Sequence, residues 1–141
     1  MTNVLYPEDY KFGIKEETEH LNTLRKFFKS DIKRSDSEFA KHDFYDDNYT
    51  FEMKSRKIFS SSHRETMITF DKIELEEGKN LILLFNFCDG LYYIEYDEEK
   101  FKKYRKEIFS RAKLETNEKI HLYIPVDDLH LIKAKCLLKV N

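Results

Sequence analysis

The stretch KHDFYDDNYTFEMKSRK, residues 41–57, decides the fold of this 141-residue chain. Apolar and polar residues alternate on either side of Asp47-Asn48, a pair whose side chains tolerate positive φ. The pattern therefore predicts two short strands, over residues 39–45 and 49–56, joined by a tight hairpin turn. Three charged residues fall inside these strands, where a sheet normally carries apolar side chains.

The three charges are Asp43, Glu52 and Lys54. Residues two apart on a strand point to the same face, so Glu52 and Lys54 share a face. A two-residue turn places Asp43 directly opposite Glu52, and like charges in that position destabilise a sheet. A divalent cation between the carboxylates removes the conflict, and Mg²⁺ binds through one or two carboxylates. Lys54 then lies close enough to reach a metal-bound water or a phosphate.

An edge hairpin with one solvated face is the alternative interpretation, in which Asp43, Glu52 and Lys54 form surface ion pairs. Asp46 and Asp47 are rival candidates for the strand aspartate. They fall in the turn, further from Lys54, so Asp43 is preferred.

A helix is predicted over residues 13–29 from apolar residues at spacings of three and four. Its apolar stripe consists of Ile14, Leu21, Leu24 and Phe28. Glu17 lies on the same stripe, and a buried carboxylate without a partner is unfavourable. Glu17 aimed at the hairpin would complete a metal site; at the edge of the stripe it would instead reach water.

The remaining segments predict an α+β fold, a mixed α/β arrangement in which helices pack on a central mixed sheet. LILLFNF, residues 81–87, predicts a strand covered on both faces. Asp89-Gly90 predicts a type I′ turn before a returning strand. The other expected elements are a loop over 30–38, a loop and short helix over 60–75, a helix over 98–112, a strand over 119–126 and a short final strand or extended tail over 132–140. Few Gly and Pro residues indicate a single domain spanning 1–141.

Composition excludes several classes of protein. The net charge of −2 argues against a polyanion binder that relies on bulk positive charge. Two cysteines indicate neither a disulfide framework nor a thiolate metal site. No apolar run approaches the length of a membrane span, and no signal pattern begins the chain. We therefore expect a soluble intracellular protein, cytoplasmic or nuclear.

The motifs resemble those of the PD-(D/E)XK nuclease superfamily, which has a restriction-endonuclease-like fold. The matching positions are Gly13 with Glu17 on the first helix, Asp43 in HDFYD, and Glu52 with Lys54 in FEMKSR. The order of helix, hairpin, strand, helix and strand is also similar, over roughly residues 10–115. His42 stands where the family's motif carries proline.

The resemblance implies hydrolysis of phosphodiester bonds with Mg²⁺ or Mn²⁺. Asp43, Glu52, the Met53 carbonyl and Glu17 would hold the metal. Lys54 would orient or deprotonate the attacking water, or neutralise charge on phosphate oxygens.

Substrate contacts are expected from Arg56, Arg64 and Lys72, although an ordinary solvated surface explains each of them as well. We expect a deoxyribonuclease, with DNA favoured over RNA as substrate and endonucleolytic over exonucleolytic cutting. The resemblance also allows a homodimer or a larger nucleic-acid-processing complex. A nuclease-like module without catalysis, which binds nucleic acid or a protein partner, is the second interpretation.

Overall fold

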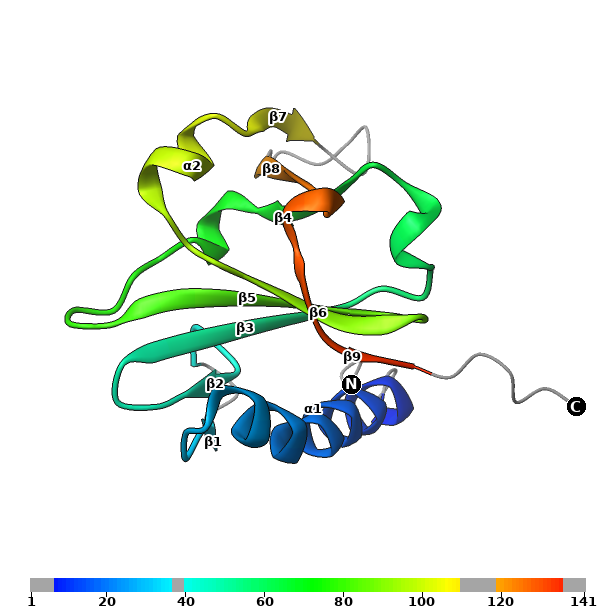
Figure 1. The fold of residues 1–141 in the computed structure, drawn as a ribbon, viewed down its shortest axis with the longest axis vertical. Helices are drawn as coiled ribbons and strands as arrows, with labels where there is room; N and C mark the ends of the chain where they lie inside the picture. The colour runs from blue at the N-terminus through cyan, green and yellow to red at the C-terminus, as the bar shows by residue number, and fades with distance from the viewer. Residues whose placement is uncertain (1–6, 37–39, 110–118, 136–141) are drawn as a thin grey trace, which may run out of the picture.

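The structure, a computed structural model, describes residues 7–36, 40–109 and 119–135; the side chains of residues 7–17 and 109 lie outside that description. Figure 1 shows the elements, which follow in the order α1 (Pro7–Phe28), β1 (Lys33–Arg34), β2 (Phe44–Tyr45), β3 (Tyr49–Ser55), η2 (Ser60–Ser62), β4 (Glu65–Thr69), η3 (Phe70–Lys72), β5 (Asn80–Phe87), β6 (Gly90–Glu95), α2 (Glu98–Lys102), β7 (Arg105–Phe109), β8 (Lys119–Pro125), η4 (Val126–Asp128) and β9 (His130–Ala134).

The described elements form layers around one mixed sheet. Its strand order is β1-β2-β3-β5-β6-β9, with β3 parallel to β5 and every other neighbouring pair antiparallel. Helix α1 covers one face, and a second sheet, β4-β8-β7, lies on the other side (Figure 1). The expected α+β class is confirmed. On the second side the described residues place a sheet together with the short helix α2, whose Phe101 is buried in the same core, so helices cover that side only in part.

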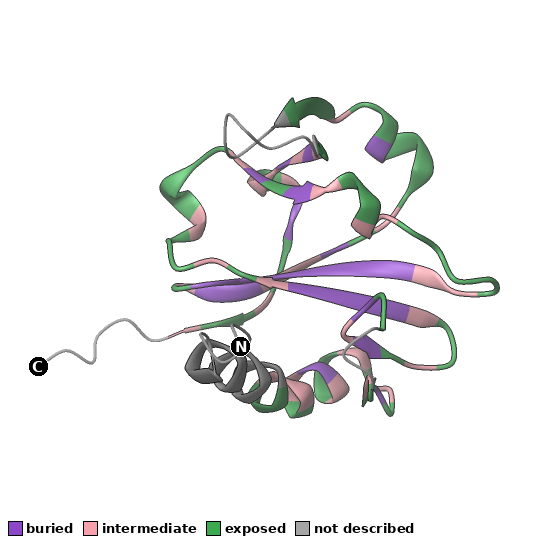
Figure 2. Cartoon of the chain, turned by 180° about the vertical axis from the view of Figure 1, so that it is seen from behind, coloured by how far each residue is buried: buried purple, intermediate pink, exposed green. Residues whose placement is uncertain are grey.

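Strand β5 is buried along almost its whole length, as Figure 2 shows. Its alternate side chains enter two different cores. Leu81, Leu83 and Phe85 pack with the second sheet, whereas Ile82 and Leu84 pack with α1 and β3. A strand covered on both faces needs a continuous apolar sequence, so the interpretation of residues 81–87 is confirmed.

The first hairpin has the expected turn position and register. Tyr45 pairs with Thr50, and Phe44 pairs with Phe51. The turn does not use positive φ, which within the described residues occurs at Lys29 and Gly78. Instead, Asp46 Oδ1 accepts hydrogen bonds from the backbone N–H groups of the two residues that close the turn, at 2.8 and 2.7 Å. The rival aspartate at position 46 thus builds the turn.

The second hairpin exists, but its predicted type I′ turn is wrong. Phe87 pairs with Gly90, so the two turn residues are Cys88 and Asp89. Neither Asp89 nor Gly90 has positive φ. Gly90 is required for space: a Cβ there would lie 3.1 Å from the Lys133 carbonyl oxygen on β9.

Two predicted helices are replaced by strands. Residues 65–69 form β4, whose buried Thr66 and Ile68 alternate with exposed Met67, a period of two. The predicted helix over 98–112 ends as α2 at Lys102, and residues 105–109 pair with β8; position 112 lies outside the described residues. No helix in the described ranges has both the length and the apolar character needed to cross a membrane.

We expect Gly90→Ala to destabilise the protein by about 1–3 kcal/mol, because the added methyl group pushes β6 away from β9. Urea unfolding measures the change. Gly78→Asn is the control: Gly78 has φ +80° and open space around it, a conformation that Asn tolerates. A free energy of unfolding unchanged by Gly90→Ala would contradict the tight approach of these strands.

Candidate functional site

The two faces of β3 differ in chemistry. Phe51 and Met53 join the core under α1. Thr50, Glu52 and Lys54 point to the opposite face, as strand alternation requires. Only 3 % of Glu52 is exposed, so a carboxylate lies buried on the face that is turned away from α1.

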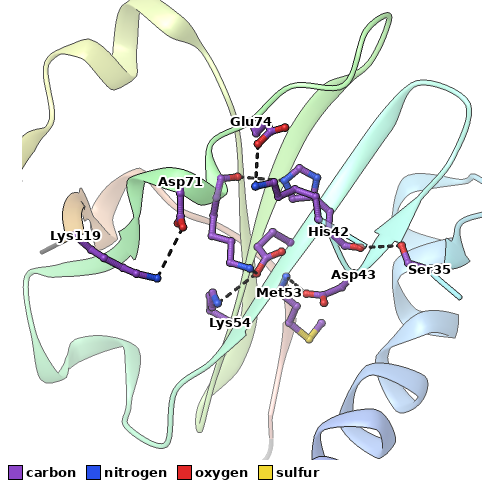
Figure 3. Close-up of polar contacts among 11 residues, drawn as sticks. Ser35, His42, Asp43, Met53, Lys54, Asp71, Glu74 and Lys119 are labelled. Atoms are coloured by element: carbon purple, nitrogen blue, oxygen red, sulfur yellow. Dashed lines mark hydrogen bonds and ion pairs between the residues drawn. The ribbon is translucent and has the colours of Figure 1, made fainter. Parts of the chain in front are cut away.

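Asp43 lies beside β3, directly before the first residue of β2. The strand ladder stops at Phe44 and Phe51, so Asp43 does not form the directly opposed pair with Glu52 that the hairpin predicts. Its backbone N–H donates to the Phe51 carbonyl at 2.9 Å. Its carboxylate Oδ2 accepts from the Met53 N–H at 2.9 Å, and Figure 3 shows the two residues side by side. The carboxylate thus occupies a backbone position that a longer β2 would have filled.

Glu52 forms ion pairs with two lysines. Lys54 Nζ lies 3.3 Å from Glu52 Oε2, and Lys72 Nζ lies 3.8 Å from the same oxygen. Lys72 was expected on a helix and to contact substrate; it ends the 3₁₀ helix η3 and contacts the carboxylate. We call Asp43, Glu52, Lys54 and Lys72 the charged cluster.

Within the charged cluster, the pKa of Glu52 lies near neutral pH. Burial raises the pKa of Glu52 from its ordinary value of 4.5 to about 7, with a further contribution from the negative charge of Asp43. The positive charges of Lys54 and Lys72 oppose this shift. Desolvation thus outweighs two ion pairs, and a third positive charge beside Glu52 would favour the ionised carboxylate.

His42 is a positioning residue that the sequence did not reveal. Only 8 % of His42 is exposed, and its Nε2 lies 3.1 Å from the Lys72 carbonyl oxygen. Ser35 Oγ donates to the His42 carbonyl at 2.7 Å (Figure 3). These bonds join the segment before β2 to η3 and so hold Lys72 beside Glu52. In the sequence, the one sign of this role of His42 is its position directly before Asp43.

Arg56 and Arg64 lie outside the charged cluster, and Arg64 directly precedes β4. Arg56 follows β3 directly, and its Nη2 donates to the Met67 carbonyl on β4 at 2.6 Å. Both arginines line one cavity of about 460 Å³. The structure therefore brings together two of the three expected substrate residues, next to the charged cluster rather than in it.

Helix α1 packs against the face of the sheet that carries Phe51 and Met53. The side chain of Glu17 lies outside the described residues, so its place in a metal site stays a prediction. Asp46, the rival aspartate, accepts a hydrogen bond from Ser30 Oγ at 2.6 Å in addition to its turn bonds. Its oxygens are therefore engaged in structural hydrogen bonds.

The donor set fits a hard divalent cation with few protein ligands. Within the described ranges, His, Cys, Asp and Glu form no group of three that could hold a metal. Mg²⁺ keeps several waters and uses one or two carboxylates together with substrate phosphates. Asp43 and Glu52 supply two carboxylates whose mutual repulsion such a charge would relieve.

Comparisons of the chain with family models, with curated proteins and with solved structures found no match.

We expect Glu52→Gln to change the pH dependence of stability. The pKa of Glu52 is higher in the folded state, so wild type loses stability as pH rises from about 4.5 to about 7, by roughly 3 kcal/mol. Glu52→Gln removes this loss, so its advantage over wild type grows between pH 5 and pH 8. Urea unfolding at both pH values measures it, with the exposed Glu77→Gln as control. Parallel pH profiles for wild type and Glu52→Gln would contradict the raised pKa.

Proposed function

We propose that this chain is a metal-dependent nuclease that hydrolyses phosphodiester bonds, in DNA rather than RNA. One observation carries the proposal. The side chains of Asp43, Glu52 and Lys54 lie together at β3: Asp43 accepts a hydrogen bond from the Met53 N–H, Lys54 is paired with Glu52, and Glu52 is buried. Burying a carboxylate beside another carboxylate is unfavourable for stability alone, as the pKa of Glu52 indicates. Such perturbed groups gather at functional sites.

Asp43 and Glu52 would hold Mg²⁺ or Mn²⁺, with the Met53 carbonyl and Glu17 as the further ligands that the family resemblance implies. The bound ion would supply Lewis acidity toward a phosphate oxygen and lower the pKa of a water. Asp43 is fixed by its bond to the Met53 N–H, and Glu52 by its burial. The two acidic groups are thus preorganised for a cation.

Lys54 and Lys72 would act on the substrate. Each ammonium lies within 4 Å of Glu52 Oε2. A cation between the carboxylates would compete for that oxygen and free the ammonium groups to turn toward a phosphate. Lys54 would then orient or deprotonate the attacking water, and Lys72 would neutralise charge that develops on the phosphate oxygens.

A restriction-endonuclease-like core belongs to the same proposal. Helix α1, the β2–β3 hairpin and the parallel β3–β5 pair support it. The connection from β3 to β5 departs from the expected order, because it runs through β4 and two 3₁₀ helices. An intracellular setting and a nucleic-acid partner, with endonucleolytic cutting and a homodimer or larger complex, complete the proposal.

A nuclease-like module without catalysis is the second candidate. Its supporting observation is that two lysines already neutralise Glu52. In that case the charged cluster is a structural ion-pair network, and the chain binds nucleic acid or a protein partner.

We expect the purified chain to cut DNA with Mg²⁺ or Mn²⁺, and to lose cutting with EDTA. Lys54→Ala should lower the cleavage rate roughly 100-fold or more, because one preorganised positive charge is removed from the reacting phosphate. Gel-based cleavage of labelled single- and double-stranded DNA measures the rate. Lys103→Ala, which removes an exposed lysine elsewhere, is the matched control.

Calorimetric titration with Mn²⁺ separates the two candidates. A nuclease should bind Mn²⁺ in wild type and bind it more weakly in Glu52→Gln. The metal-dependent reaction would be rejected if neither protein showed a heat of Mn²⁺ binding and if the wild type either cut DNA in EDTA or did not cut it at all.

A further inference from the structure

A cavity lined by arginine and apolar side chains adjoins the charged cluster. It lies between the end of β3 and β4, which is an edge strand of the described three-stranded sheet. Its volume of about 460 Å³ is within the range of small-molecule sites. The side chains that matter here are Arg56, Arg64, Arg105, Ile58, Met67 and Tyr123.

Two of the three arginines carry positive charge that no carboxylate neutralises within the described residues. Arg105 is paired with Glu65, at 2.7 Å, and with Glu107. Arg56 is half-buried, and its Nη2 donates to the neutral backbone carbonyl of Met67. Burial lowers the pKa of the Arg56 guanidinium, which shows that the charge is poorly solvated. Arg64 is exposed at the same cavity. An anion at this position would stabilise both charges.

The rest of the cavity wall combines apolar and polar side chains. Besides Ile58, Met67 and Tyr123 it includes His63, Thr66 and Glu65, and the Glu65 carboxylate is paired with Arg105. Ile58 and Met67 are 38 % and 37 % exposed. The Arg105 guanidinium covers the Tyr123 ring at 3.9 Å from its centroid. Guanidinium groups bind phosphate through paired N–H donors, and flat or apolar surfaces bind nucleobases. The wall therefore suits a ligand that has both parts.

We propose that this cavity binds a nucleoside monophosphate unit, with its phosphate on Arg56 and Arg64 and its base against Ile58, Met67 and the guanidinium plane of Arg105, which covers Tyr123. The role of the unit rests on the proposed function: it is the nucleotide that neighbours the bond to be cut. Lys54 and Arg56 are two residues apart on one face of a strand, about 7 Å, comparable to the separation of neighbouring phosphates along a strand. A nucleic-acid strand can therefore follow β3 from the charged cluster into the cavity.

Calorimetric titration with deoxythymidine monophosphate in EDTA tests the binding without any metal. Wild type should bind it, and Arg56→Met should weaken binding roughly tenfold or more while keeping the aliphatic stem. Arg64→Met, at an exposed position that folding tolerates, should also weaken it. Arg34→Met, on β1, is the control for loss of one positive charge.

Two further titrations test which part of the ligand is recognised. Thymidine, which lacks phosphate, should bind much more weakly, and so should inorganic phosphate, which lacks the base. Equal affinity for inorganic phosphate and the nucleotide would overturn the base contact. Absence of binding at millimolar nucleotide, or binding unchanged in Arg56→Met and Arg64→Met, would overturn the site.

The charged-cluster variants separate this proposal from the nuclease. Lys54→Ala and Glu52→Gln should bind the nucleotide as wild type does, because neither residue lines the cavity. If wild type bound the nucleotide but did not cleave DNA, the nucleotide site would be supported and the nuclease activity rejected. If wild type cleaved DNA but did not bind the nucleotide, the nuclease activity would be supported and the nucleotide site rejected.

Discussion

The double burial of β5 is the constraint on which the rest of the structure depends. A strand with apolar side chains on both faces must be covered twice, and α1 and the β4-β8-β7 sheet are the two covers. Strand β3 pairs with β5 in parallel. Residues 56–79 must therefore cross from the end of β3 to the start of β5. That crossing carries β4 into the second sheet and η3 back toward Glu52. The charged cluster is therefore assembled by the same connection that covers the core.

The polar face of β3 is a local departure from this apolar plan. Its neighbour β5 contributes Leu83 and Phe85 to the core on that side, opposite Glu52 and Lys54 in the ladder. A stability-optimised strand would continue the apolar surface. Glu52 instead is desolvated enough to raise its pKa to about 7 in spite of two nearby lysines. The structure thus tolerates a buried carboxylate whose ionised form is destabilised relative to that of a solvated glutamate.

Sequence reasoning succeeded where local patterns determine structure. The apolar run of β5 and the turn position at Asp47-Asn48 depend on neighbours in the chain, and both were predictable. The helix over 98–112 was not, because pairing of 105–109 with β8 overrides a helical periodicity, and no local pattern encodes that partner. In the site, Glu52 and Lys54 were placed correctly on one face. The cross-strand position of Asp43 was wrong because β2 begins one residue later, at Phe44, and the contact between Lys72 and Glu52 depends on a long-range bond to His42.

Hydrogen bonds and ion pairs within the described residues account for some of the polar groups on this face of β3, but not for all of them. Asp43 has the Met53 N–H, and Glu52 has its lysines, so each could be structural on its own. Thr50 Oγ1 is buried without a hydrogen-bond partner in the described part of the chain, and Arg56 has no carboxylate there. Thr50 lies on β3 and Arg56 lies directly after it, on either side of Glu52 and Lys54. The Thr50 hydroxyl is difficult to attribute to folding, since buried polar groups are normally paired. Arg56 has a hydrogen bond to the Met67 carbonyl, but this neutral acceptor does not balance its charge. The groups that folding leaves uncompensated are therefore the Thr50 hydroxyl, the ionised form of Glu52 and the positive charge of Arg56, and the proposed cation and phosphate would act on the last two.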